Sequence, residues 1–200
     1  MERHEAEQIL DLMANMRGDL REGLIYQRWW LIWIVAGVEM AITCTVTHLI
    51  HAGGERRGWV FAIIWAIHIG LIPLFIALIH RRAGGQRTIT ERNIWWIWTT
   101  FIICSLLTAS LNWMMMLPLF GVAPAVSLLS AFAFAMMAMI TSRAFLIGSG
   151  FFVVVMVAMT LQQDIQFLIY GGAWFVVLVF LGLYFRFMPT LQPTKGTKRL

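Results

Sequence analysis

Six apolar segments, each long enough to cross a bilayer, occupy most of the 200 residues of this chain. A membrane-spanning helix needs about 20 mainly apolar residues, because the hydrocarbon core is about 30 Å thick and each residue adds about 1.5 Å. Hydrophobic residues make up 60% of the chain and charged residues only 12%, which is far from the composition of a water-soluble domain. The sequence therefore predicts an all-α, polytopic membrane helical bundle with six transmembrane helices. The predicted spans are residues 29–50, 59–79, 94–117, 122–140, 144–161 and 165–185.

The distribution of basic residues predicts the orientation of these spans. Thirteen of the fifteen Lys and Arg residues fall before the first span, in the second and fourth loops or after the last span, whereas the first loop has only Arg56 and Arg57. Because cytoplasmic loops carry the excess of Lys and Arg, both termini are predicted to be cytoplasmic (N-in/C-in) in a plasma (inner) membrane. The net charge of +5 has the same explanation, and the absence of a nucleic-acid-binding motif argues against a nucleic-acid partner.

The two ends of the chain differ from the spans in composition. Residues 1–28 are predicted to form an amphipathic cytoplasmic helix, because apolar residues recur there at steps of three and four. These residues are Ile9, Met13, Met16, Leu20 and Leu24. Such a helix either lies on the inner membrane surface or docks a cytoplasmic protein partner, and the sequence does not separate the two. Residues 29–187 form the predicted transmembrane domain, and residues 188–200 are predicted to be a basic cytoplasmic tail.

Two ionisable residues are predicted to lie deep in the membrane and to meet. Glu39 is ten residues past Trp29, which places it about 15 Å along the first helix. His68 has a similar depth in the second helix, and antiparallel pairing around Gly53 and Gly54 puts position 39 opposite about position 69. A charged carboxylate at this depth costs several kcal/mol, so Glu39 is expected to be protonated, paired or hydrated. A Glu–His pair can share one proton, as a proton relay requires.

The same pair has a simpler interpretation, in which one buried contact fixes the packing of two helices. Thr43 and Thr47 follow Glu39 at steps of four and extend the candidate intramembrane polar or proton site toward the outer surface. This polar face predicts either a water-filled vestibule or threonines that bond to carbonyls of their own helix. Both alternatives remain open at the level of the sequence.

Cys44, His48 and His51 share the spacing of metal ligands on one helical face, and Met115 ends the third span at a similar depth. Thiolate, imidazole and thioether groups bind copper, and the first two also bind zinc, so a copper or zinc site is one hypothesis. Core packing and interfacial histidine are the simpler explanation of the same residues.

Small residues in the last three spans predict close helix–helix contacts. They are Ser127, Ala131, Ala135, Gly148, Gly150, Gly171, Gly172 and Gly182. Polar residues of the third span are predicted to form a strip that could face Glu39 and His68. This strip consists of Ser105, Thr108, Ser110 and Asn112. The polar residues before the sixth span, Gln162, Gln163, Asp164 and Gln166, are expected to be solvated in an outer turn.

The segments "RWWLIW" (28–33) and "IWWIW" (94–98) each open an outward-running span after a charged stretch. With its N-terminal amphipathic helix, six spans and basic tail, the chain resembles a group of small, uncharacterised bacterial six-helix inner-membrane proteins. The resemblance implies a bacterial origin and this topology, and it carries no functional residue over to the chain.

The residues of the predicted spans limit the classes of function that we expect. No nucleophile–base set is present, so the chain is not expected to be an enzyme. The leading hypothesis is a non-catalytic membrane subunit, scaffold or sensor, embedded in the lipid bilayer and able to oligomerise. The alternative is a small transporter or channel for protons or a small cation, which would use Glu39 and His68.

Overall fold

Six long helices make up nearly all of the part of the chain that the structure describes. The computed structural model describes residues 29–55, 57–81, 89–114 and 121–187, and within these ranges it contains helices, short links and no strand. All six helices are long and apolar enough to cross a membrane, which confirms the prediction of six apolar helices of spanning length. They are α2 Trp29–Ala52, α3 Gly58–Arg81, α4 Ile89–Met114, α5 Val122–Ile140, α6 Ala144–Leu161 and α7 Gln166–Phe187, and a short 3-10 turn, η2 (Gln163–Ile165), precedes α7.

Some predictions fall on other parts of the chain. The amphipathic helix expected in residues 1–28 and the basic tail expected in residues 188–200 lie outside the described residues, as does the expected end of the third span at 115–117.

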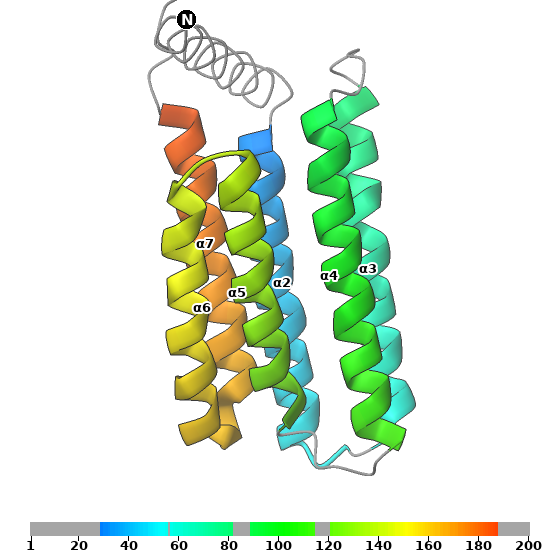
Figure 1. The fold of residues 1–200 in the computed structure, drawn as a ribbon. Helices are drawn as coiled ribbons and strands as arrows, with labels where there is room; N and C mark the ends of the chain where they lie inside the picture. Colours follow the sequence, from blue (N-terminus) through cyan, green and yellow to red (C-terminus); the bar gives the residue numbers. More distant parts are fainter. Residues whose placement is uncertain (1–28, 56, 82–88, 115–120, 188–200) are drawn as a thin grey trace, which may run out of the picture.

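Four helices form the core of the bundle. Helix α2 packs along α7 in the most extensive helix–helix contact of the described ranges, and α5 packs along α6. Helix α6 also packs on α7, and this contact joins the two pairs into one bundle. In Figure 1 these four helices stand together, and α3 and α4 stand to one side of them.

Helices α3 and α4 are attached to this core at its periphery. Helix α3 packs on α2, and α4 packs on α5. In an 18-residue apolar stretch of the α4 span (Arg92–Asn112) only 6% of the residues are buried, against 17% in such a stretch of the α3 span and 44% in that of the α7 span. Apolar side chains on the remaining surface of α3 and α4 suit contact with lipid tails.

Aromatic rings fill the centre of the core. Phe134 of α5, Phe152 of α6 and Trp174 of α7 are almost fully buried, and their ring centroids lie between 5.1 and 5.4 Å apart. Trp98 of α4 reaches the same cluster, with its ring 5.6 Å from that of Phe134 and 5.7 Å from that of Trp174. Because lipid tails are as apolar as these rings, it is the close fit of the rings that favours association of the helices.

Glycines bring α2 and α7 close together. A methyl group added at Gly171 would come within 2.5 Å of Cys44 Cβ, and one added at Gly182 would come within 2.7 Å of the Trp30 carbonyl oxygen. Gly37 of α2 makes a similar approach, since its added methyl group would lie 3.0 Å from Leu178 Cβ. The α2–α7 interface is therefore built from small residues on both helices.

The predicted packing role of the glycines is correct only in part. Gly148 lies against Phe134 and Val177, as a packing glycine does. Gly150 and Gly172, which were expected to allow close approach, have open space where a side chain would begin. The sequence shows which residues are small, but the direction in which each faces depends on the neighbouring helices.

The helices alternate in direction along the chain, so the bundle has two ends (Figure 1). We call them the Arg186 end, where α2 begins and α7 ends, and the Gly54 end, where α2 ends and α7 begins. At the Gly54 end, the turn between α2 and α3 uses Gly54 with a φ of 90°, a conformation that glycine adopts without strain. Glu55 accepts a 2.9 Å hydrogen bond from Arg57 Nε, and this bond together with charge attraction raises the pKa of the Arg57 guanidinium.

Candidate functional site

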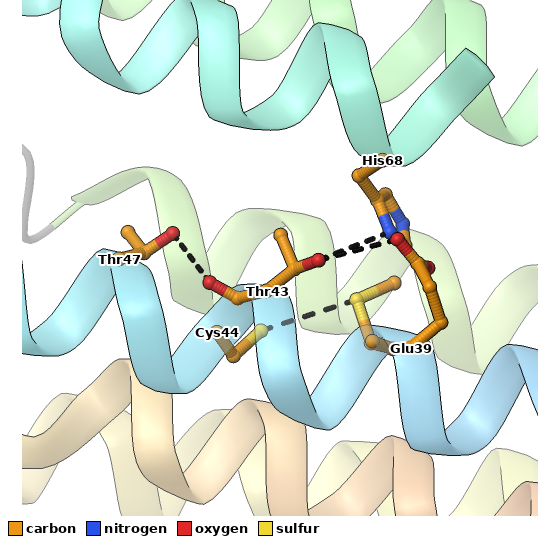
Figure 2. A network of polar contacts seen from close by, with 6 residues as sticks. Glu39, Thr43, Cys44, Thr47 and His68 are labelled. Carbon is orange, nitrogen blue, oxygen red and sulfur yellow. Dashed lines mark hydrogen bonds and ion pairs between the residues drawn. The ribbon is translucent and has the colours of Figure 1, made fainter. Parts of the chain in front are cut away.

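Glu39 and His68 contact each other, as antiparallel pairing of the first two spans predicts. The Glu39 carboxylate forms an ion pair with Nδ1 of His68, which joins α2 to α3 (Figure 2). The side chain of His68 is 4% exposed and that of Glu39 is 13% exposed, so the pair is largely shielded. A proton between these two atoms can belong to either partner, because the carboxyl group and Nδ1 can each act as donor or acceptor.

Thr43 completes this contact from one turn further along α2. Its hydroxyl lies 3.3 Å from Glu39 Oε1, to which it donates, and 3.4 Å from His68 Nδ1. The three side chains therefore satisfy one another where α2 meets α3 (Figure 2). Such mutual satisfaction is what lets polar groups persist in an apolar medium.

The surroundings of the pair differ on its two sides. The ring of Trp65, one turn before His68, stands edge-on to the imidazole at a centroid distance of 5.3 Å. Toward the Arg186 end, Glu39 borders a recess of about 10 Å³, which is roughly the space for one water molecule. The other side chains lining this recess are all apolar: Ile32, Val35, Ala36, Ile72, Phe75 and Ile76.

The threonine hydroxyl groups beyond Glu39 have two kinds of partner. Thr47 is buried, and its hydroxyl donates a 2.8 Å hydrogen bond to the carbonyl of Thr43. Thr45 is exposed and bonds in the same way to the carbonyl of Ala41. Back-bonding to the helix thus accounts for these two hydroxyl groups, whereas the hydroxyl of Thr43 turns to Glu39 and His68.

The residues of the metal hypothesis are spread over different surroundings. Cys44 is fully buried against Gly171, with its thiol 3.9 Å from the Met40 sulfur. The ring of His51 lies between those of Phe61 and Phe167, at 6.1 and 6.2 Å. Met115 lies outside the described residues, and no group of three or more His, Cys, Asp or Glu side chains in the described ranges is placed to hold a metal ion. The copper or zinc site stays a prediction.

A second polar cluster within the core was not predicted. The hydroxyl groups of Ser130 on α5 and Tyr170 on α7 lie 2.9 Å apart, and Ser130 also donates to the carbonyl of Val126. Ser127, expected to be only a small packing residue, donates a 2.9 Å hydrogen bond to the carbonyl of Phe152 on α6. A tyrosine among apolar residues is a weak signal of a buried polar contact. The two serines of α5, Ser127 and Ser130, are three residues apart, and this spacing could have indicated one polar face of the helix.

The expectation that Gln166 is solvated is wrong. Gln166 is only 1% exposed, and neither its amide oxygen nor its amide nitrogen has a hydrogen-bond partner among the described residues. The nearby Gln162 and Gln163 are exposed, as a solvated turn predicts. The difference arises because Gln166 begins α7, and the first turn of this helix is already packed within the core.

The polar strip predicted on the third span is not gathered around Glu39 and His68. Helix α4 packs mainly on α5, and Thr108 donates to the carbonyl of Cys104 in its own helix. Ser110 is exposed. The described polar contacts of the Glu39–His68 pair come from α2 and α3 alone.

Comparison with known proteins adds no family to this description. No protein-family model matches the chain, and no curated protein or solved structure matches it.

Proposed function

We propose that the chain is a non-catalytic integral membrane protein that acts as a subunit, scaffold or sensor. In this proposal the Glu39–His68 pair holds α3 against the core. The proposal includes the orientation that the basic residues predict, with the Arg186 end in the cytoplasm of a bacterial cell and the protein in its plasma membrane. A cytoplasmic protein partner of residues 1–28 is part of the same proposal.

The observation that carries the proposal is the closed arrangement of the polar side chains. Glu39, Thr43 and His68 use one another as partners where α2 and α3 bring two ionisable groups together. The recess beside Glu39 has room for about one water molecule and is otherwise apolar. An arrangement of this kind suits a contact that fixes two helices better than it suits a continuous pathway.

Transport of protons or a small cation is the second candidate function. It is favoured by the contact of a carboxylate with an imidazole near the middle of two spanning helices, since ionisable residues at this depth commonly mark ion pathways. The two candidates differ in what the pair does when a proton gradient is applied.

Proton flux in proteoliposomes separates them. Wild-type protein and a Glu39→Gln variant would be reconstituted at equal, folded amounts, and internal pH would be followed after a pH step. The proposed function predicts the same passive leak for both proteins and for empty liposomes. A wild-type flux that is lost in folded Glu39→Gln protein would contradict the subunit role and establish transport.

The orientation has its own test. Ala52 and Arg143 are exposed at opposite ends of the bundle, so each can be replaced by cysteine in a background in which Cys44 and Cys104 are changed to serine. We expect a membrane-impermeant thiol reagent to label Ala52→Cys in intact cells and Arg143→Cys only after lysis. The reverse pattern would invert the proposed orientation.

A further inference from the structure

Helix α4 has the least buried apolar stretch of the six spans, and one of its faces is exposed over most of the helix. Its other face, with Ile94, Trp98 and Phe101, meets the core. On the exposed face, residues recur at steps of three and four, which is the spacing of helices that pack along each other. We call this set the α4 stripe. It consists of Thr100, Ile103, Leu107, Ser110 and Met114.

The outward hydroxyl groups of α4 have no partner among the described residues. Thr100 and Ser110 on the stripe and Thr99 beside it are exposed, and none of the three makes a hydrogen bond there. Other threonines of the described spans donate to a carbonyl of their own helix. These are Thr45, Thr47, Thr108 and Thr160. Helix α4 therefore contains both kinds, since Thr108 bonds to its own helix whereas Thr99 and Thr100 do not.

Lipid tails cannot supply the missing partner. Thr99 and Thr100 are seven and eight residues past Arg92, where the apolar span begins, so they lie about 10 to 12 Å along it. Acyl chains neither donate nor accept hydrogen bonds, so a hydroxyl group that faces them gains from a protein partner. Two unpaired hydroxyl groups at this depth favour a second polypeptide on the α4 stripe.

The exposed face of α3 has no comparable feature. Helix α3 is also peripheral, but its exposed residues between Gly58 and Leu78 are all apolar. Lipid tails suit such a face as well as another helix does. Helix α3 is therefore the reference for α4, because it has the same peripheral position without unpaired hydroxyl groups.

The α4 stripe is complementary to itself. It has no charged residue, so two identical stripes do not repel each other. In a membrane dimer with its two-fold axis along the membrane normal, each residue lies opposite its own copy at the same depth. A hydroxyl group both donates and accepts, so Thr100 can pair with the same residue of a second copy. Ile103 and Leu107, between the two hydroxyl groups of the stripe, supply apolar contact.

We propose that the α4 stripe is the interface of a homodimer, in which α4 packs parallel to α4 of a second copy and the hydroxyl groups of Thr99, Thr100 and Ser110 form hydrogen bonds between the copies. This goes beyond the proposed function. It does not involve the Glu39–His68 pair, so the two proposals are tested separately. In the dimer, the least buried span lies between α5 of its own copy and α4 of the other.

The oligomeric state of the wild-type protein is the first test. Full-length protein with one fluorophore per chain would be reconstituted in phosphatidylethanolamine–phosphatidylglycerol liposomes over a range of protein densities, and photobleaching steps would be counted. We expect two-step traces to predominate and to give way to single steps on dilution. Single-step traces at every density would overturn the proposal, because they would mean that lipid or a different protein covers the stripe.

Cysteine cross-linking tests which helix forms the interface. In the background in which Cys44 and Cys104 are changed to serine, Ile103→Cys and Leu107→Cys place a thiol on the stripe, and Ile67→Cys places one on α3 at similar exposure. A disulfide needs Cα atoms within about 7 Å, so we expect both α4 variants to form linked dimers about five-fold faster, or more, than Ile67→Cys. Equal rates, or faster linkage through α3, would contradict an α4 interface.

A pair of threonine variants tests the hydroxyl groups. Thr100→Val removes a hydroxyl group of the stripe at nearly constant volume, whereas Thr160→Val removes one that is exposed on α6 and bonds to its own helix. We expect Thr100→Val to raise the dimer dissociation constant about three-fold or more, as the loss of a hydrogen bond between spanning helices does. Thr160→Val should leave it unchanged. Equal effects of the two variants would overturn the pairing of hydroxyl groups across the interface.

Discussion

Helices α3 and α4 both lie outside the four-helix core, but different chemistry attaches them to it. Helix α4 inserts Trp98 among the aromatic rings of the core, within 6 Å of Trp33, Phe134 and Trp174. Helix α3 instead meets α2 through His68, which pairs with Glu39 and contacts Thr43. The attachment of α4 is apolar and depends on the fit of its rings, whereas this attachment of α3 is polar.

This difference determines what can alter each attachment. Ring packing depends little on pH, whereas the strength of a carboxylate–imidazole contact depends on how many protons the pair holds. Helix α3 is therefore the helix whose attachment can respond to a proton, and α4 is the one whose attachment is expected to be constant. In a membrane, neither helix gains from leaving water, so these specific contacts carry more of the attachment than they would in a soluble protein.

The largest effect is expected from removing the aromatic attachment of α4. Trp98→Ala leaves a cavity among three rings, and such a change costs about 3 kcal/mol of folding free energy. Trp96, on the same helix but 65% exposed, provides the control, because Trp96→Ala removes a lipid-facing ring. Unfolding in mixed detergent micelles, followed by circular dichroism, measures both. Equal losses for the two variants would mean that α4 is not held by Trp98.

The core on which both helices depend is expected to be almost as sensitive. Gly171→Ala places a methyl group 2.5 Å from Cys44 Cβ and should cost about 2 kcal/mol through overpacking. Gly172→Ala, one residue later, places its methyl group in open space. This change should be neutral or stabilising by up to about 1 kcal/mol, because alanine has a higher helix propensity than glycine. The same unfolding assay compares them. A harmless Gly171→Ala would contradict the close α2–α7 contact.

A smaller effect is expected from removing the polar attachment of α3. Glu39→Ala deprives His68 and Thr43 of their shared partner and should cost about 1.5 kcal/mol, near the upper limit measured for polar contacts in membrane proteins. Cross-linking between cysteines placed on α2 and α3 should also become less efficient, because α3 moves more freely. Unchanged stability together with unchanged cross-linking would show that the pair does not hold α3.

The smallest effect is expected at Thr43, which only supports the pair. Thr43→Val removes a hydroxyl with two long contacts and should cost about 0.5 kcal/mol. Thr45→Val is the matched control, because Thr45 is exposed and bonds only to its own helix. If Thr45→Val costs as much as Thr43→Val, the loss is common to threonines of this helix and does not reflect support of the pair.

The sequence predicted the parts of this fold that follow from length and local spacing. Six apolar segments became six helices, since only a helix satisfies its own backbone in lipid. The meeting of Glu39 and His68 followed from two adjacent spans joined by a short turn, which leaves little choice of register. These predictions used neighbours in sequence and needed no knowledge of how distant helices pack.

The arrangement of distant helices was beyond such reasoning. Helices that are apolar all round carry no stripe that marks their buried face, so the division into four core helices and two peripheral ones was not predicted. For the same reason Gly172 was expected to pack and does not, whereas Gly37 packs and was overlooked. The burial of Gln166 was missed because a polar residue beside a turn looks solvated until the first turn of its helix is placed in the core.

The most direct test of this account is a double-mutant cycle between Glu39 and His68. Unfolding free energies would be measured for the wild type, Glu39→Ala, His68→Ala and the double variant, all at one pH. If the pair holds α3 on the core, the effects of the single changes will not add, and the coupling energy will lie between about 0.6 and 1.7 kcal/mol. Additivity within about 0.3 kcal/mol would contradict the account, because it would mean that the two side chains stabilise the protein independently.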